Sequence, residues 1–294
     1  MSSARERAAL VALLQSGRRP HHDYAEAVER AGSAVTVLQD ELAGSGGQAS
    51  LLPEDPTPHL DRATADIEAW CHDGIQLLTV LDDAYPENLR TVHDRPPIVF
   101  VAGSLTPDDA RSIAIIGSRR ASTTGLAIAA EIAGAVARDG YTVVSGLAAG
   151  IDTAAHEAAL RVGARTVAVI GTGLRHAYPP QNAALQRRIA AEGAVVSQFW
   201  PDAPPTRKSF PLRNAVMSGL ALGTVVVEAS FRSGARVQAR LALAHGRPVF
   251  LWRTLLHEPW ARELTRRPGV YVIDEAAQVM RAVERLNAPD ALRE

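Results

Sequence analysis

The stretch SIAIIGSRRASTTGLAIAAEIAGAVARDGYTVVSGLAAGID, residues 112–152, decides the fold. It contains an apolar strand, a glycine-bearing turn, an alanine-rich helix, a second apolar strand and a second glycine-bearing turn. The same alternation continues to residue 286, which is typical of a parallel sheet covered by helices. Several of the runs contain no polar residue, so their strands should be buried on both faces. We therefore predict a doubly wound α/β domain with a mostly parallel sheet.

The strands that this pattern predicts are Ser112–Gly117, Thr142–Ser145, Thr166–Ile170, Ala194–Gln198, Thr224–Glu228, Pro248–Leu251 and Val270–Ile273. Each is followed by a helical segment, and the last helix should span Glu275–Leu286. This part of the chain, residues 111–286, forms the predicted α/β domain, and residues 287–294 form a tail.

The first 110 residues have a different character. The sequence of residues 1–60 predicts a small helical N-terminal region and a linker rich in helix-breaking residues. The expected helices are Arg5–Gln15, Tyr24–Ala31 and Ala34–Leu42, and the linker is Gly44–Pro58. Residues 61–110 predict an adaptor segment with a helix through Trp70 and strands at Gln76–Leu81 and Ile98–Ala102. The function of these two regions does not follow from their sequence.

Composition restricts the function. A chain of 294 residues with 47% hydrophobic content has room for about two folded domains and their cores. Its 31 Lys and Arg nearly balance its 32 Asp and Glu, so the net charge of −1 gives no overall attraction for a polyanion. Any anion-binding face must be local, and Lys208 is the single lysine of the chain.

The cysteine and histidine content argues against a disulfide and a metal site. Cys71 is the single cysteine, so the chain has no internal disulfide, and the nine histidines show no metal-ligand spacing. We therefore expect no metal site and no cofactor. The N-terminus has no signal-peptide pattern, and no apolar run reaches the roughly 18 residues of a membrane span. We therefore expect a cytoplasmic protein that does not contact a membrane.

In doubly wound folds, ligands bind beyond the carboxyl ends of the strands. Gly117, Ser118 and Arg119 follow the first strand, and Gly146 and Gly150 lie in the turn after the second. Glycine allows close backbone approach, and the Arg guanidinium suits phosphate oxygens. Neither GxGxxG nor GxxxxGK[ST] is present, so a dinucleotide fingerprint and a P-loop are absent. Each turn could equally be structural.

A basic segment precedes the helix expected at Asn214–Leu222. Arg207, Lys208, Phe210 and Arg213 could hold phosphates and stack a base, as in single-stranded nucleic-acid sites. They could equally form a solvated loop with Phe210 folded into the core. Both interpretations stay open on these residues alone.

Glu228 ends a buried strand, where an unbonded carboxylate is costly. It either caps nearby backbone N–H groups or belongs to a site. The structural role is favoured because no partner base accompanies it.

Taken in order, these segments resemble the DNA-processing protein A (DprA/Smf) family. The matching motifs, within residues 65–250, are Gly117-Ser118-Arg119, Ser145-Gly146-Leu147-Ala148-x-Gly150-Ile151-Asp152, Gly171-x-Gly173-Leu174, Tyr178-Pro179-Pro180-x-Asn182, Phe210-Pro211-x-Arg213-Asn214, Val226-Val227-Glu228-Ala229 and Arg232-Ser233-Gly234. Several ordered motifs are more specific than any one of them.

The resemblance implies an extended Rossmann-like domain that binds single-stranded DNA without cleaving it. It further implies a homodimer that protects DNA during uptake by natural transformation and helps to load the recombinase RecA. Carried over by motif, the phosphate-binding residues are Gly117, Ser118 and Arg119. The other implied site residues are a basic wall of Arg207, Lys208 and Arg213, a stacking platform at Phe210, and the rim-shaping Gly146, Gly150, Asn214 and Gly234.

Two further classes of function compete. A nucleotide sensor or phosphoribohydrolase-like enzyme on the same fold would use Glu228 beside Arg232-Ser233-Gly234, but the Pro-Gly-Gly-x-Gly-Thr loop of that group is missing. The third class is an interaction scaffold. The chain departs from the DprA/Smf pattern at residues 235–260, and the apolar and basic residues of Arg232–Arg240 and Trp252–Trp260 predict an interface there.

Overall fold

The computed structural model describes residues 3–44, 55–231 and 233–287. Its strands are β1 (Ile75–Thr79), β2 (Ile98–Gly103), β3 (Ser112–Ile116), β4 (Thr142–Ser145), β5 (Thr166–Val169), β6 (Ala194–Ser197), β7 (Gly223–Val226), β8 (Val249–Trp252) and β9 (Val270–Ile273). Its α-helices are α1 (Ala4–Ser16), α2 (His21–Ala31), α3 (Ala34–Gly44), α4 (Thr57–His72), α5 (Glu87–Arg90), α6 (Thr123–Arg138), α7 (Ile151–Arg161), α8 (Ala183–Glu192), α9 (Ser209–Leu220), α10 (Gly234–Ala244), α11 (Pro259–Leu264) and α12 (Ala277–Asn287).

The strands form one mixed sheet. Within the described residues it has nine strands in the order β1-β2-β6-β5-β4-β3-β7-β8-β9. The pairs β1/β2 and β2/β6 are antiparallel, and the remaining pairs are parallel. The predicted mostly parallel α/β fold with a helical N-terminal region is therefore confirmed. The strands of the adaptor segment extend this sheet, because β2 pairs with β6 of the α/β region.

The sheet is buried between two layers of side chains, as its sequence requires. Ile113 and Ile115 of β3 belong to a core shared with α6, α7 and α12, whereas Ala114 and Ile116 face the other core, with α9 and α10. Successive residues of a strand point to opposite faces, so an all-apolar strand suits a sheet that is covered twice.

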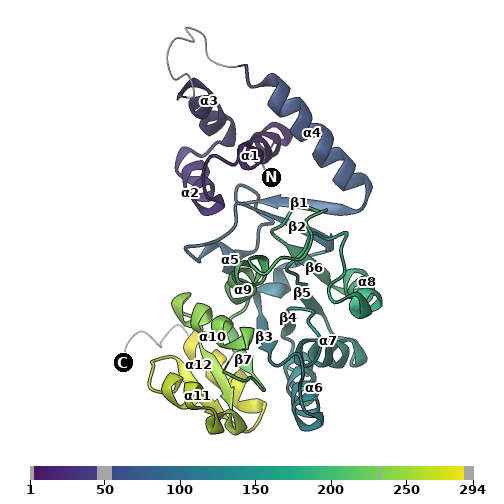
Figure 1. The fold of residues 1–294 in the computed structure, drawn as a ribbon, viewed down its shortest axis with the longest axis vertical. Coiled ribbons are helices and arrows are strands. Elements are labelled where there is room, and N and C mark those ends of the chain that lie inside the picture. Colours follow the sequence, from purple (N-terminus) through teal and green to yellow (C-terminus); the bar gives the residue numbers. More distant parts are fainter. Residues whose placement is uncertain (1–2, 45–54, 232, 288–294) are drawn as a thin grey trace.

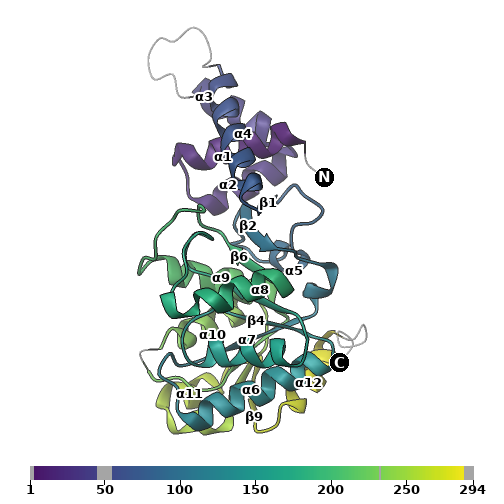
Figure 2. The same ribbon diagram turned by 90° about the vertical axis from the view of Figure 1, so that its right-hand side faces the viewer.

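The N-terminal helices form the opposite end of the molecule from α6 and α11 (Figures 1 and 2). Ion pairs join them to the adaptor segment: Arg7 of α1 lies 2.7 Å from Asp82, and Arg95 pairs with Glu29 of α2. None of the helices in the described ranges is long and apolar enough to cross a membrane. The predicted limits at residues 60, 110 and 286 stay a prediction, and most of the linker (45–54) and tail (288–294) lies outside the described residues.

One boundary differs in a way that matters for the site. The helix expected from Asn214 begins at Ser209, because Pro211 lies in its first turn, where a missing N–H costs no hydrogen bond. Arg213 and Asn214 are therefore helical residues and not part of a loop.

Candidate nucleic-acid interface

The strand order places a site between β3 and β7. From β3 the chain winds outward through β4, β5 and β6, and it then returns to the other side of β3 with β7, β8 and β9. Ligands of doubly wound sheets bind where the winding reverses, beyond the carboxyl ends of the strands. A cavity of about 470 Å³ opens at this point, lined by the turns after β3, β4 and β7 and by α9 and α10.

The first turn, after β3, is fixed by its backbone. The Ser118 N–H donates to the Glu228 carbonyl oxygen at 2.6 Å, and the Ser118 carbonyl accepts from the Ile151 N–H at 3.2 Å. A Cβ on Gly117 would lie 2.5 Å from Cγ1 of Ile151, so only glycine fits there. The hydroxyl of Ser118 accepts from the Arg120 N–H at 3.1 Å. Gly117, Ser118, Arg119 and Arg120 all line the cavity.

The second turn packs closely beneath the first. Gly150 has a φ of +83°, and a Cβ there would lie 2.3 Å from the Ser118 carbonyl oxygen. A Cβ on Gly146 would lie 1.8 Å from Nη1 of Arg213. These two glycines, predicted to shape the rim, thus allow the turn to approach Ser118 and Arg213.

Arg213 lies elsewhere than the sequence predicts. The resemblance implies a basic wall of Arg207, Lys208 and Arg213, but unlike the other two, which are exposed, Arg213 is only 6% exposed. Its Nη1 donates to the carbonyl oxygens of Gly146 and Val169, at 2.5 and 2.8 Å, and its Nε donates to Oδ1 of Asn214 at 3.1 Å. The helical start at Ser209 turns this side chain inward, where with Asn214 it lines the cavity from below.

Asp152 offsets the charge of Arg213 at the base of the cavity. Asp152 is buried and accepts a hydrogen bond from the Ala148 N–H at 3.3 Å. Burial raises the pKa of Asp152, and the nearby Arg213 partly counteracts this shift. Burial likewise lowers the pKa of Arg213, and Asp152 counteracts it. Any net attraction for an anion must therefore come from the cations above them.

Arg119 supplies such a cation beside an aromatic pair. Its guanidinium lies 5.0 Å from the ring centroid of Phe210, and Phe210 lies 5.5 Å from Tyr178. Phe210 is half-buried and lines both the main cavity and an adjoining one of about 190 Å³. It is thus neither folded into the core nor fully exposed. Tyr178, which is 39% exposed, belongs to this aromatic group, although sequence analysis assigned no role to this residue and named it only within a motif.

Arg207 and Lys208 are exposed at the start of α9 and line neither cavity. Across the described ranges, no carboxylate lies within ion-pair distance of Arg119, Arg120, Arg207 or Lys208. The helices α6, α7, α9 and α10 also begin at this edge, and helix N-termini attract anions. The positive charge at this edge therefore comes from these four exposed cations and from the helix starts.

The start of α10 completes the cavity. Gly234 lines it, and Oγ of Ser233 caps the helix by accepting from the Ala235 N–H at 3.2 Å. A Cβ on Gly234 would meet no atom within 4 Å, so this glycine has no steric role of the kind seen at Gly150. Arg232, the first residue of the predicted motif, lies outside the described residues.

Glu228 has a structural role. Both carboxylate oxygens accept from the Ser122 N–H at 3.1 Å, and Oε2 accepts from the Ser122 hydroxyl at 2.6 Å. Ser122 in turn caps α6 through the Gly125 N–H. The carboxylate thus accepts from a backbone N–H, as the structural interpretation of Glu228 predicts.

We expect Glu228→Ala to lower the free energy of unfolding by about 1–2 kcal/mol, because it removes a charged cap. Urea denaturation measures this loss. Glu131→Ala removes an exposed carboxylate from the same helix, α6, and should change stability by less than about 0.5 kcal/mol. Equal losses in the two variants would contradict the capping role.

His156 gives the α/β region a dependence on pH. This α7 side chain is fully buried, its Nδ1 lies 2.7 Å from Oγ1 of Thr166, and burial lowers its pKa from 6.5 to about 3. Below pH 6.5 the unfolded chain therefore binds a proton that the folded chain does not, and stability falls as the pH falls toward 3.

Between pH 7 and about pH 4.5, protonation of His156 in the unfolded chain should lower the free energy of unfolding by roughly 2 kcal/mol. His156→Leu should lose that part of the pH dependence, since the Thr166 hydroxyl keeps its bond to the Val143 carbonyl oxygen. Unfolding free energies of both proteins at the two pH values test this. The same pH dependence in wild type and variant would assign the effect to other groups.

Comparisons with known proteins identify the family of this chain. Residues 76–287 match the family described as DNA recombination-mediator protein A. The DNA processing protein DprA of Bacillus subtilis is 32% identical over 227 residues, which cover 77% of this chain and 75% of that protein. The chain spans about half the length of two other curated relatives, Smf proteins, that it matches.

Two solved structures extend the likeness to the fold. The structure of DprA from Streptococcus pneumoniae has a TM-score of 0.74 at 29% identity, over 95% of this chain and 98% of that chain. The structure of DNA processing protein A from Helicobacter pylori, described for its single-stranded DNA binding mode, has a TM-score of 0.63 at 26% identity, over 72% of this chain and 96% of that chain. The resemblance drawn from the ordered motifs is confirmed, and this chain belongs to the DNA recombination-mediator protein A (DprA/Smf) family.

Proposed function

We propose that this protein binds single-stranded DNA at the cavity between β3 and β7. The observation that carries the proposal is the contact of Arg119 with Phe210 at this cavity, where a cation that has no carboxylate partner among the described residues meets an aromatic face. Phosphates lie against Gly117, Ser118, Arg119 and the helix starts, and a base stacks on Phe210 or Tyr178. Backbone charge and stacking give little sequence preference.

Arg207 and Lys208 extend the contact outside the cavity, where they hold phosphates that enter or leave it. Arg213, Asn214, Gly146 and Gly150 act from beneath by fixing the turns, and Gly234 leaves the start of α10 open. These roles follow from how exposed each residue is. The exposed cations contact the DNA strand, and the groups beneath them maintain the shape of the cavity.

The DNA is held without cleavage. Glu228 is bound to Ser122, and Asp152 is buried, so neither carboxylate is free to act as a general base.

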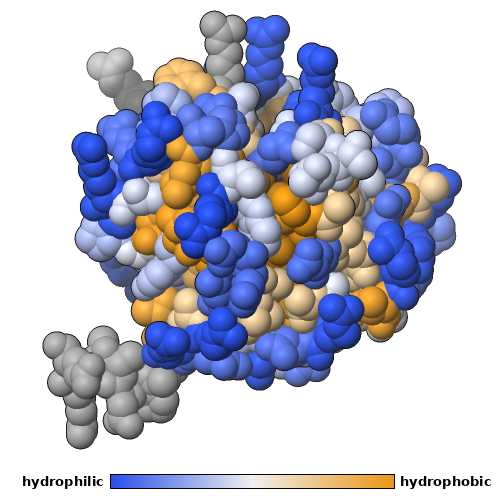
Figure 3. All heavy atoms as spheres, turned by 90° about the horizontal axis from the view of Figure 1, so that it is seen from below, coloured by the Kyte–Doolittle hydropathy of each residue, from blue (hydrophilic) through white to orange (hydrophobic). Residues whose placement is uncertain are grey.

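We further propose that the protein works in the cytoplasm, protects single-stranded DNA and assists a RecA-type recombinase. We propose a homodimer as its working form. Exposed Phe231 and Val237 support a surface of this kind, and Figure 3 shows hydrophobic residues among hydrophilic ones at the end remote from the N-terminal helices. Trp252 and Trp260, also predicted for an interface, are buried.

Fluorescence anisotropy with a labelled oligonucleotide and its duplex tests the proposal. Tighter binding of the single strand is expected, because only unpaired bases can stack on Phe210 or Tyr178. Tighter binding of the duplex would contradict it. Incubation with nucleoside monophosphates covers the competing enzyme class: release of free base would replace the binding function with hydrolysis.

A further inference from the structure

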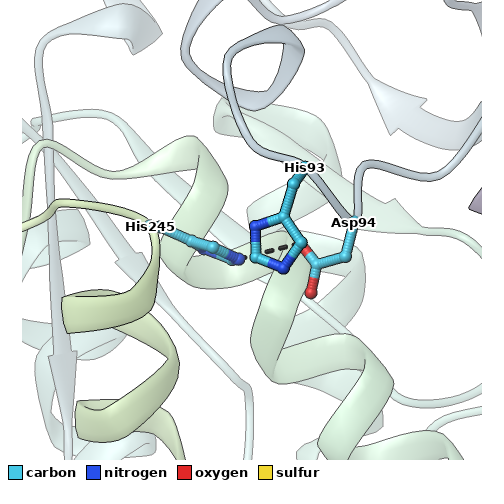
Figure 4. A group of neighbouring side chains, drawn as sticks. All are labelled: His93, Asp94 and His245. Atoms are coloured by element: carbon cyan, nitrogen blue, oxygen red, sulfur yellow. Dashed lines mark hydrogen bonds and ion pairs between the residues drawn. The ribbon is translucent and has the colours of Figure 1, made fainter. Parts of the chain in front are cut away.

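A group of metal-ligating side chains lies outside the proposed DNA site. His93 and Asp94 lie in the loop after α5, and His245 ends α10 (Figure 4). One ligand atom from each residue lies within 4.8 Å of the other two. This group could not be predicted from the sequence, because His245 and Asp94 are 151 residues apart and no spacing motif links them.

His245 is held in the orientation that a metal ligand needs. Its side chain is fully buried, with Nε2 2.8 Å from Oδ1 of Asp94. The other ring nitrogen, Nδ1, lies 2.9 Å from Oγ of Ser218, a buried residue of α9. A polar partner on the far nitrogen is the usual companion of a metal-bound histidine, since it fixes the ring and its tautomer.

The two imidazole rings have a spacing that suits one ion. Their centroids are 5.4 Å apart, and the ring planes are inclined at 73°. Two histidines on one tetrahedral zinc, with Zn–N bonds of about 2.0–2.1 Å, place their ring centroids roughly 5 Å apart. The exposed His93 can rotate toward such an ion, and its ligand atom already lies within 4.8 Å of those of His245 and Asp94.

The charge at the group also favours a cation. Among the described residues, no arginine or lysine lies within ion-pair distance of Asp94, whose carboxylate instead lies against His245. Two imidazole nitrogens with one carboxylate oxygen form a donor set for Zn²⁺, Co²⁺ or Ni²⁺. The exposure of His93 leaves the remaining coordination position to water.

We propose that His93, Asp94 and His245 form a binding site for one divalent transition-metal ion of the zinc type. The ion joins the adaptor segment to the C-terminal end of α10, the helix whose first residues line the DNA cavity. Its bound state therefore stabilises the packing of the adaptor segment against α9 and α10. The site is separate from the proposed DNA contacts and does not depend on them.

Titration of the untagged, metal-free protein with Zn²⁺, followed by calorimetry, and with Co²⁺, followed by its visible absorption, tests the site. We expect one equivalent to bind, a tetrahedral Co²⁺ spectrum and a higher melting temperature with Zn²⁺. His93→Ala should weaken binding at least about tenfold. Because His93 is exposed, this variant should fold normally, and Asp94→Asn, which preserves shape, serves as the second variant.

His72→Ala is the matched control, since His72 is an exposed histidine beside an aspartate, Asp73, and the part of the chain that the structure describes offers the pair no third ligand. It should bind the metal like the wild type. Absence of a bound equivalent, equal affinity of His93→Ala and wild type, or loss of binding in His72→Ala would each overturn the proposal. Single-stranded DNA binding should be the same in wild type and His93→Ala. A failure of the metal-site proposal can therefore be told apart from a failure of the proposed DNA binding.

Discussion

Arg213→Met is expected to lower the free energy of unfolding by about 3–5 kcal/mol, the usual cost of removing one partner from a buried charged pair. Arg213 donates to the carbonyl oxygens of Gly146 and Val169, which join the turn after β4 to the end of β5. Methionine retains much of the length but none of the donors, so both buried acceptors lose a bond. Asp152 also loses its nearest counter-charge, and its pKa, already raised by burial, should rise further.

Urea denaturation at neutral pH measures this loss. Arg207→Met is the control, because it removes an exposed arginine at the start of the same helix and should change stability by less than about 0.5 kcal/mol. Arg213→Lys retains the charge without the planar fork and should fall between wild type and Arg213→Met. A stability loss below about 1 kcal/mol for Arg213→Met would show that Arg213 is not the support of the cavity floor.

Gly150→Ala is expected to cost at least about 3 kcal/mol and to weaken single-stranded DNA binding. The backbone of Gly150, with φ +83° and ψ −125°, lies in a region that L residues rarely adopt, which by itself makes a side chain costly, by about 1–3 kcal/mol. The added Cβ would also lie 2.3 Å from the Ser118 carbonyl oxygen, so the first turn must move. That turn carries Ser118 and Arg119, which is why a substitution at Gly150 should alter DNA affinity.

Gly163→Ala separates these two causes. Gly163 has a similar φ of +69°, but a Cβ there meets no atom within 4 Å. We expect it to lose only about 1–2 kcal/mol and to bind DNA normally. Equal stability losses in the two variants, or unchanged DNA affinity of Gly150→Ala, would contradict the close packing of Gly150 on Ser118.

Much of the fold could be predicted because the apolar runs are short, regular and separated by breakers. The strands at Thr142–Ser145 and Val270–Ile273 were predicted to the residue, and the other α/β strands shift by one or two positions at their ends. The start of α9 was missed because Phe210-Pro211 looks like a loop, although proline is well tolerated in the first turn of a helix.

The site could be predicted only in part, for a related reason. Turn residues such as Ser118 and Arg119 lie next to strands in the sequence, so the topology places them at one edge of the sheet. The inward direction of Arg213 depends on where α9 begins, and the prediction from sequence placed that start five residues too late. The contact between Tyr178 and Phe210, and the group of His93, Asp94 and His245, join distant segments, so no local pattern could show them.

The salt dependence of single-stranded DNA binding tests the central claim most directly. A labelled oligonucleotide is titrated over a range of salt concentrations with wild type, Arg119→Ala, Lys208→Ala and, as control, Arg62→Ala, which removes an exposed cation from α4. If Arg119 and Lys208 hold phosphates, each variant should bind more weakly, with a slope of log affinity against log salt that is shallower by about 0.7. Arg62→Ala should match the wild type. Unchanged affinity and slope in both Arg119→Ala and Lys208→Ala would contradict a DNA site between β3 and β7.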